Sequence, residues 1–191
     1  MEFVFIRHGE GEHTLDIPHS LHSSDPSLTK KGEKQAESLF DDFPLTSKDL
    51  VIVSPTRRTL QTAKYWIGDI NCKQIVHSFV SPRIFPLRDN AKTLPCDGIL
   101  DKEIIAREFP DFEIAADFNE IVWEEGINLI PAAEFLSIGV QFIEWCKKFN
   151  NERVYIVSHD GTITSYRELI SGVKLTRKDF PKETAWCKVE I

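Results

Sequence analysis

The sequence has few cysteines, and they lie far apart. Only four occur among 191 residues, and no two of them form a C-x-x-C pair: Cys72, Cys96, Cys146 and Cys187. This spacing argues against a zinc ribbon and against a dithiol redox motif. Scattered cysteines in a chain of this size are typical of reduced thiols in a cytosolic protein, so no disulfide framework is expected.

The chain also lacks a long apolar run, a basic leader and an excess of basic residues. No apolar run approaches the ~18 residues of a membrane span, and Met1-Glu2 leads directly into a short apolar stretch without the basic start of a secretory signal. The formal net charge of −7 argues against a nucleic-acid partner. We therefore expect a cytoplasmic protein without a membrane or nucleic-acid partner; its oligomeric state is left open.

Short apolar runs alternate with segments of helical period. Four-residue apolar runs predict buried strands, and apolar residues at three- and four-residue steps predict helices. We expect strands at 3–6, 50–53, 74–77 and 153–157, an edge strand at 185–191, and helices at 29–43, 54–67, 132–149 and 162–170. Such alternation predicts an α/β fold, a three-layer α/β/α sandwich with a mostly parallel central sheet.

Capping residues predict where two of these helices begin. Thr29 is expected to cap the first helix, and Ser54-Pro55 is expected to begin the second, with serine as the N-cap. The buried face of the first helix is predicted to consist of Ala36, Leu39, Phe40 and Phe43.

The middle of the chain is the least regular part. Residues 78–130 contain Pro82, Pro86, Pro95 and Pro110, and only a short helix near 100–108 is predicted. We interpret residues 1–191 as a single domain. Within it, residues 78–130 are expected to form an inserted lid or specificity region.

Polar residues follow three of the apolar strands. Arg7 and His8 follow the first, Ser54 follows the second and His159 follows the fourth, while Arg58 lies one turn into the second helix. Carboxyl ends of parallel strands meet at one sheet edge, where open α/β folds bind ligands. Two arginines suit a tetrahedral oxyanion. Two histidines suit phosphoryl transfer, with one as nucleophile and one as donor.

Four ordered motifs resemble the histidine phosphatase superfamily, which is also called phosphoglycerate mutase-like. They are Arg7-His8-Gly9, the segment 25–36 (DPSLTKKGEKQA), the segment 54–63 (SPTRRTLQTA) and Ser158-His159-Asp160-Gly161. An isolated R-H-G is a weak signal, whereas four motifs in the family's order cover most of the chain. The resemblance implies a phosphoglycerate mutase-like fold and a compact phosphatase.

The resemblance also implies roles for individual residues. His8 would be the nucleophile, and the phosphoryl oxygens would be held by Arg7, Arg58 and His159. The backbone N–H of Asp160 would point into the pocket, and Thr14 stands where many members carry a phosphate-binding asparagine. Neighbouring cations would lower the pKa of His8 and keep its ring neutral. No cofactor and no metal is implied, because the arginines take the place of a cation.

Three carboxyl residues are candidates for the proton donor to the leaving group. The family uses a carboxyl residue after the third strand, and Leu87-Arg88-Asp89 occupies that place. Asp89 is therefore the choice, although its side chain is one methylene shorter than the usual glutamate. Glu10 and Asp97 are the alternatives. Arg57 is expected to face outward or to contact substrate.

Three functions are compatible with these motifs. The leading one is a metal-independent phosphatase that hydrolyses a small phosphomonoester through a phosphohistidine on His8. The alternatives are a cofactor-dependent phosphoglycerate mutase and a non-catalytic protein that binds a phosphorylated ligand. His13, His19 and His22 fit no metal-binding pattern and are expected in a solvated loop. Arg83, Arg88, Lys92 and Lys102 would favour an acidic substrate if they faced the pocket.

Overall fold

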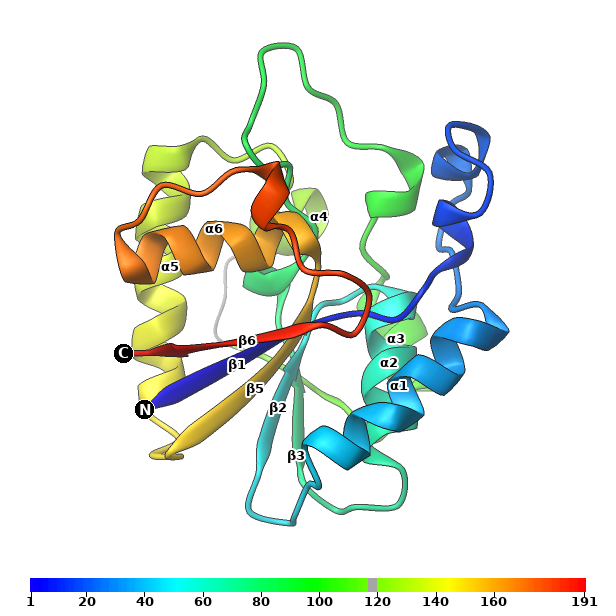
Figure 1. Cartoon of the computed structure of the whole chain (residues 1–191), viewed down its shortest axis with the longest axis vertical. Coiled ribbons are helices and arrows are strands. Elements are labelled where there is room, and N and C mark those ends of the chain that lie inside the picture. The colour runs from blue at the N-terminus through cyan, green and yellow to red at the C-terminus, as the bar shows by residue number, and fades with distance from the viewer. Residues whose placement is uncertain (117–119) are drawn as a thin grey trace.

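A six-stranded sheet runs through the centre of the molecule in the computed structural model, which describes residues 1–116 and 120–191 (Figure 1). In spatial order its strands are β4 (Glu113–Ile114), β3 (Lys73–Val76), β2 (Leu50–Val53), β5 (Arg153–Ser158), β1 (Glu2–Arg7) and β6 (Trp186–Glu190). Among the described residues, β6 is antiparallel to its neighbour β1 and the other strand pairs are parallel. The mostly parallel sheet and the C-terminal edge strand are therefore confirmed.

The central strands are apolar throughout because both faces of the sheet are covered. Along β1, Val4 and Ile6 join the core on one face, while Phe3 and Phe5 join the core on the other. All four side chains are fully buried. Parallel strands between two helical layers have this continuous apolar character, whereas half-solvated strands alternate.

Helices α1 (Lys30–Asp42), α2 (Arg57–Ile67) and α3 (Lys102–Glu108) cover one face of the sheet (Figure 1). Thr29 caps α1 as predicted, since its hydroxyl oxygen accepts a hydrogen bond from the N–H of Gly32. The prediction that Phe40 is buried is wrong, because 45% of it is exposed. Phe40 is one residue beyond Leu39, so it lies outside the buried stripe of α1.

The opposite face carries α5 (Ala132–Lys147) and α6 (Asp160–Ser171) (Figure 1). Aromatic rings fill this layer: Phe5 stacks on Tyr166, which also contacts Phe135 and Phe142. Helix α6 begins two residues earlier than predicted, so its first turn starts at Asp160, directly after the strand.

Helix α2 begins later than the sequence predicts. Its N-cap is Thr56 and its first residue is Arg57, so Ser54 and Pro55 precede it. The N–H of Ser54 donates to the carbonyl oxygen of Val157 and continues the ladder between β2 and β5. The backbone therefore stays extended past Ser54, and its side chain is available for another contact.

The stretch 78–130 contains more regular structure than predicted. Besides α3 it holds β4, helix α4 (Glu120–Glu125) and short 3-10 turns at Ser78–Val80 and Pro95–Asp97. Its residues 117–119 lie outside the described part of the chain. The lid role and the single-domain interpretation stay predictions. No helix among the described residues is long and apolar enough to cross a membrane.

Candidate active site

Strand order and register bring the polar strand ends together. β2, β5 and β1 are neighbours, with Arg7 opposite Ser158 and Val53 opposite Val157. One residue further along, the N–H of His8 donates to the carbonyl oxygen of Ser158, and the rings of His8 and His159 lie 5.1 Å apart between centroids. The predicted convergence at the carboxyl edge of the sheet is therefore present.

Other residues of the four motifs hold the loop after β1 in place. A Cβ on Gly9 would lie 2.5 Å from the carbonyl oxygen of Gly32, so glycine allows this loop to approach α1 closely. Three side-chain oxygens accept from loop backbone N–H groups: Thr62 Oγ1 from Gly9, Gln35 Oε1 from Glu10 and Gln61 Oε1 from Leu28. These motif residues therefore support the site without lining it.

A backbone carbonyl fixes the position of the His8 proton. His8 Nδ1 lies 2.7 Å from the carbonyl oxygen of Gly9, which can only accept a hydrogen bond. Nδ1 therefore carries the proton, and the lone pair is on Nε2, 3.3 Å from the donor Nε of Arg58. Burial, and next the Arg58 charge, hold the pKa of His8 well below its ordinary value. The ring is neutral and its unprotonated nitrogen faces the arginine.

Arg58 connects most of the site. Its guanidinium is fully buried, and Nη1 donates to the carbonyl oxygen of Cys96 at 2.7 Å. Nη2 lies 3.2 Å from His159 Nδ1 and 3.4 Å from Asp97 Oδ1. One side chain thus contacts both histidines and a carboxylate, which gives the site a buried positive charge between the two rings.

Ser54 positions His159. Because Arg58 Nη2 only donates, His159 Nδ1 accepts, and the neutral ring carries its proton on Nε2. That nitrogen lies 2.8 Å from Ser54 Oγ and donates to it. Burial, followed by the Arg58 charge, holds the pKa of His159 well below its ordinary value. The serine predicted to cap a helix therefore holds a histidine of the site instead.

Arg7 is shared between the site and the C-terminal segment. Its Nη1 donates to the carbonyl oxygen of Pro181 at 2.8 Å, and its Nη2 lies 3.3 Å from Asp160 Oδ2 and 3.8 Å from Glu183 Oε1. The positive charge of Arg7 therefore balances the Asp160 carboxylate, and that carboxylate is not turned away from the site. Arg7 Nε is buried and has no hydrogen-bond partner among residues 1–116 and 120–191, so this donor is available to a ligand.

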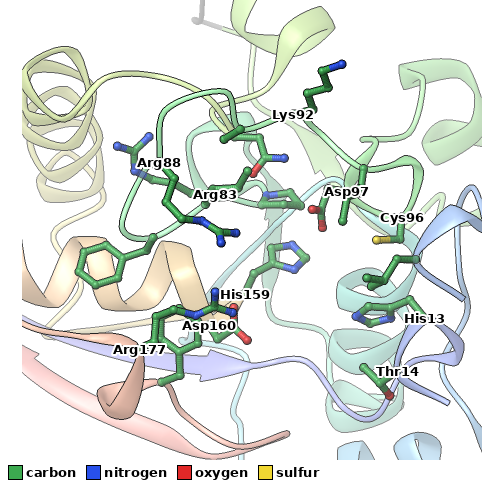
Figure 2. Close-up of a pocket in the computed structure, with 18 of the residues that line it drawn as sticks. His13, Thr14, Arg83, Arg88, Lys92, Cys96, Asp97, His159, Asp160 and Arg177 are labelled. Carbon is green, nitrogen blue, oxygen red and sulfur yellow. The ribbon is translucent and has the colours of Figure 1, made fainter. Parts of the chain in front are cut away.

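A cavity of about 810 Å³ is lined by Arg7, His8, Arg58, His159 and Asp160, and we call this part of the cavity its floor (Figure 2). Six cationic and three acidic side chains line it, in a chain whose net charge is −7. Apolar side chains complete the walls, among them Ile17, Leu21, Phe85, Leu94 and Phe180. No cluster of three or more potential metal ligands is present in the described part of the chain. The cavity is thus locally cationic, with apolar side chains in its walls.

The loop after β1 contributes Thr14 and His13 to the cavity. The Thr14 hydroxyl donates to the carbonyl oxygen of Gly11 at 2.8 Å, so its proton is engaged by the backbone. The expectation that His13 is solvated is wrong. It is 8% exposed, its ring centroid lies 5.5 Å from that of His8, and its Nδ1 has no hydrogen-bond partner among the described residues. Burial, with a smaller effect of Arg58, lowers its pKa to about 3.

The three candidate proton donors lie in different environments. Glu10 is bound by Lys31 at 2.7 Å and by the Thr29 hydroxyl at 2.9 Å, and it does not line the cavity. Asp89 lines the cavity from an exposed loop. Only 24% of the Asp97 side chain is exposed, and burial raises its pKa although Arg58 opposes the shift. Of these three candidates, Asp97 is the one that contacts Arg58.

Comparison with known proteins identifies the family. Residues 3–79 match the sequence model described as Histidine phosphatase superfamily (branch 1). Over 170 residues the chain is 30% identical to a probable phosphatase of Schizosaccharomyces pombe, an alignment that covers 86% of this chain and 76% of the relative. The chain belongs to the histidine phosphatase superfamily. It is also 29% identical over 189 residues to a phosphoglycerate mutase-like protein of Arabidopsis thaliana, covering 82% of this chain and 69% of that protein.

Solved structures of two phosphatases have the same fold. The alpha-ribazole phosphatase of Shigella flexneri superposes with a TM-score of 0.63 at 20% identity, covering 100% of this chain and 91% of that one. The ecdysone phosphate phosphatase of Bombix mori superposes with a TM-score of 0.66 at 13% identity, covering 98% and 88%. The phosphoglycerate mutase-like α/β/α sandwich predicted from the motifs is confirmed.

Proposed function

We propose that this histidine phosphatase hydrolyses phosphomonoesters through a phosphohistidine on Nε2 of His8. The hydrogen bond between His8 Nδ1 and the Gly9 carbonyl oxygen is the observation that carries the proposal. It directs the lone pair of a neutral imidazole toward Arg58, which is where an anionic phosphoryl group would bind. The same carbonyl oxygen would stabilise the positive charge that the phosphorylated ring acquires.

The reaction takes two steps. In the first, His8 Nε2 forms a bond to phosphorus, the bond from phosphorus to the alkoxy oxygen breaks, and that oxygen takes a proton from a carboxyl group. In the second, a water oxygen bonds to phosphorus and gives a proton to the carboxylate, while the phosphorus–nitrogen bond breaks. Inorganic phosphate leaves, and His8 recovers its lone pair.

Buried donors would stabilise the charge on the phosphoryl oxygens in both steps. Arg7 and Arg58 supply positive charge, and the first turn of α6 offers the N–H of Asp160. His159 would exchange a protein contact for a phosphoryl oxygen, because both its nitrogens have protein partners. We assign to His13 the donor role that the resemblance gave to Thr14, since the Thr14 hydroxyl is engaged with Gly11.

We assign proton donation to Asp97. A general acid must hold its proton near the working pH, and burial shifts the pKa of Asp97 in that direction. Asp97 also lies beside Arg58, which contacts the nucleophile. Asp89, the residue that the motif order favours, lines the same cavity but is exposed. Replacing each carboxyl group separately decides between them.

Relatives support the substrate class without naming one substrate. The superposed structures include an alpha-ribazole phosphatase, an ecdysone phosphate phosphatase and a phosphoserine phosphatase of Entamoeba histolytica. The alcohols released by these enzymes differ widely, so we propose a small phosphomonoester as substrate. Most residues between Pro82 and Asp97 line the cavity, which supports the proposal that the region 78–130 sets specificity.

Release of phosphate from p-nitrophenyl phosphate tests the function. We expect hydrolysis that persists in EDTA, that vanadate inhibits and that His8→Ala abolishes. Assay of 3-phosphoglycerate in parallel for 2-phosphoglycerate formation separates a phosphatase from a mutase. Hydrolysis that survives in full in His8→Ala contradicts the proposal, as does conversion to 2-phosphoglycerate faster than release of phosphate.

A further inference from the structure

Three cationic side chains line the outer part of the cavity, which we call its mouth. Arg88, Lys92 and Arg177 all line the cavity and are exposed. Among residues 1–116 and 120–191, none of these three side chains has an ion-pair or hydrogen-bond partner. By contrast, Arg7 and Arg58 on the floor are tied to the site by several contacts.

These outer cations exceed what one phosphoryl group requires. The floor already supplies Arg7, Arg58, the histidine rings and a helix N-terminus to a single phosphoryl dianion. A cavity of about 810 Å³ holds a considerably larger molecule than phosphate. The chain has a net charge of −7, so exposed cations that gather at the mouth of this cavity favour an anionic ligand.

Two of the three cationic side chains point into the cavity. Figure 2 shows Arg88 reaching from its loop toward His159, and Arg177 approaching from the opposite side beside Asp160. The Arg177 guanidinium lies 5.5 Å from the centroid of the Phe180 ring, which restricts its orientation. Lys92 differs, because its ammonium group points away from the cavity in the same view.

We propose that Arg88 and Arg177 form a second anion subsite, which binds a carboxylate or another anionic group carried by the phosphomonoester substrate. This inference rests on the proposed function and narrows it to substrates with two anionic groups. The planar forks of two arginines suit a carboxylate, which they can bind with paired hydrogen bonds. The subsite lies at the mouth, so it would orient the substrate while the floor holds the scissile phosphoryl group.

A pair of ligands that differ in one group tests the subsite. 3-Phosphoglycerate carries a carboxylate where glycerol 3-phosphate carries a hydroxymethyl group, and their chains have the same length. We expect kcat/KM to be about tenfold higher for 3-phosphoglycerate at low salt, since each exposed ion pair adds a modest gain. The preference should shrink as salt approaches about 0.5 M, because exposed charges are screened.

Four variants locate the preference. Arg88→Gln and Arg177→Gln should each lower the ratio of the two kcat/KM values about threefold, and the double variant should bring it near one. Lys92→Gln removes the same charge from the same rim and should keep the wild-type ratio. Far-UV circular dichroism confirms that each variant folds. A ratio near one in the wild type overturns the proposal, and so does a ratio that Lys92→Gln lowers as much as Arg88→Gln.

Binding to a full-length His8→Ala protein separates the subsite from catalysis. Calorimetry with the same two ligands should show about tenfold tighter binding of 3-phosphoglycerate, with the preference lost on adding Arg88→Gln and Arg177→Gln. Equal binding of both ligands overturns the subsite even if the wild type hydrolyses them. A binding preference without hydrolysis by the wild type supports the subsite and contradicts the proposed phosphatase activity.

Discussion

The Nε atom of Arg58 lies 3.3 Å from Nε2 of His8, the nitrogen that the Gly9 carbonyl leaves unprotonated. A guanidinium donor and a histidine lone pair therefore face each other in a buried site. Burial of the ring, and next the Arg58 charge, keep His8 neutral by lowering its pKa, and the guanidinium places positive charge where a phosphoryl group would meet it. The catalytic proposal depends on this contact.

Replacing Arg58 by lysine should lower kcat/KM about 10²- to 10³-fold. A lysine keeps the charge but cannot contact His8, Cys96 and His159 at once. Steady-state hydrolysis of p-nitrophenyl phosphate provides the measurement.

The neighbouring arginine is the matched control. Arg57 binds Asp25 and Glu108, each at 2.6 Å, and does not line the cavity. Arg57→Lys should keep near-wild-type activity and lose at most about 1 kcal/mol of unfolding free energy, because the ion pairs are partly exposed. Equal losses of activity in the two variants would contradict the account.

Replacing His13 by phenylalanine should lower kcat/KM about 10- to 100-fold. Phenylalanine fills similar space beside His8 but has no N–H to donate to a phosphoryl oxygen. His13→Gln, which restores a donor, should recover part of the loss. The inhibition constant for vanadate should rise in parallel with the loss of kcat/KM. Full activity in His13→Phe would show that this ring only packs.

The carboxyl donor should be revealed by the leaving group. Asp97→Asn should reduce hydrolysis of an alkyl phosphate about 10²-fold or more, because an alkoxide needs a proton as it departs. The same variant should have a smaller effect on p-nitrophenyl phosphate, whose phenolate leaves more readily. Asp89→Asn is the matched comparison and should affect both substrates alike. If Asp89→Asn instead slowed the alkyl phosphate more than p-nitrophenyl phosphate, and Asp97→Asn affected both alike, Asp89 would be the proton donor.

The free energy of unfolding should fall as the pH decreases below 6.5. His13 and His77 are buried, and burial lowers the pKa of each to about 3. Between these values the unfolded chain binds protons that the folded chain does not, so each histidine costs about 1 kcal/mol per pH unit. Urea unfolding at pH 7.5 and 5.5 measures the slope. His13→Phe should reduce that slope by about 1 kcal/mol per pH unit, and an unchanged slope would contradict the burial of His13 as a neutral ring.

The sheet and the centre of the site could be predicted because their signals are local. Runs such as Phe3–Ile6 are apolar throughout only when both faces of a sheet are covered, and β1 satisfies this. Arg7, His8 and His159 follow such runs directly, so parallel strands bring them together. Arg58 could also be predicted, because it lies in the first turn of α2, the helix that follows β2.

The remaining features depend on contacts between distant segments. Ser54 reads as a helix cap, yet its N–H pairs with β5 and its hydroxyl with His159, 105 residues away. His13 is buried because the loop closes on itself through a bridge between Gly11 and Leu28. Its place five residues after His8 in the sequence was the available signal. A strand of two residues, such as β4, is too short to show a periodic pattern in the sequence.

Covalent labelling shows whether His8 is the nucleophile. Wild-type protein is mixed briefly with a radiolabelled phosphomonoester, denatured in alkali to preserve phosphohistidine, and digested for mass spectrometry. We expect one labelled peptide from the wild-type protein, phosphorylated on His8. The label should be absent from His8→Asn and present in Asp97→Asn. Release of phosphate by wild-type protein without label on His8, or label that persists in His8→Asn, would contradict it.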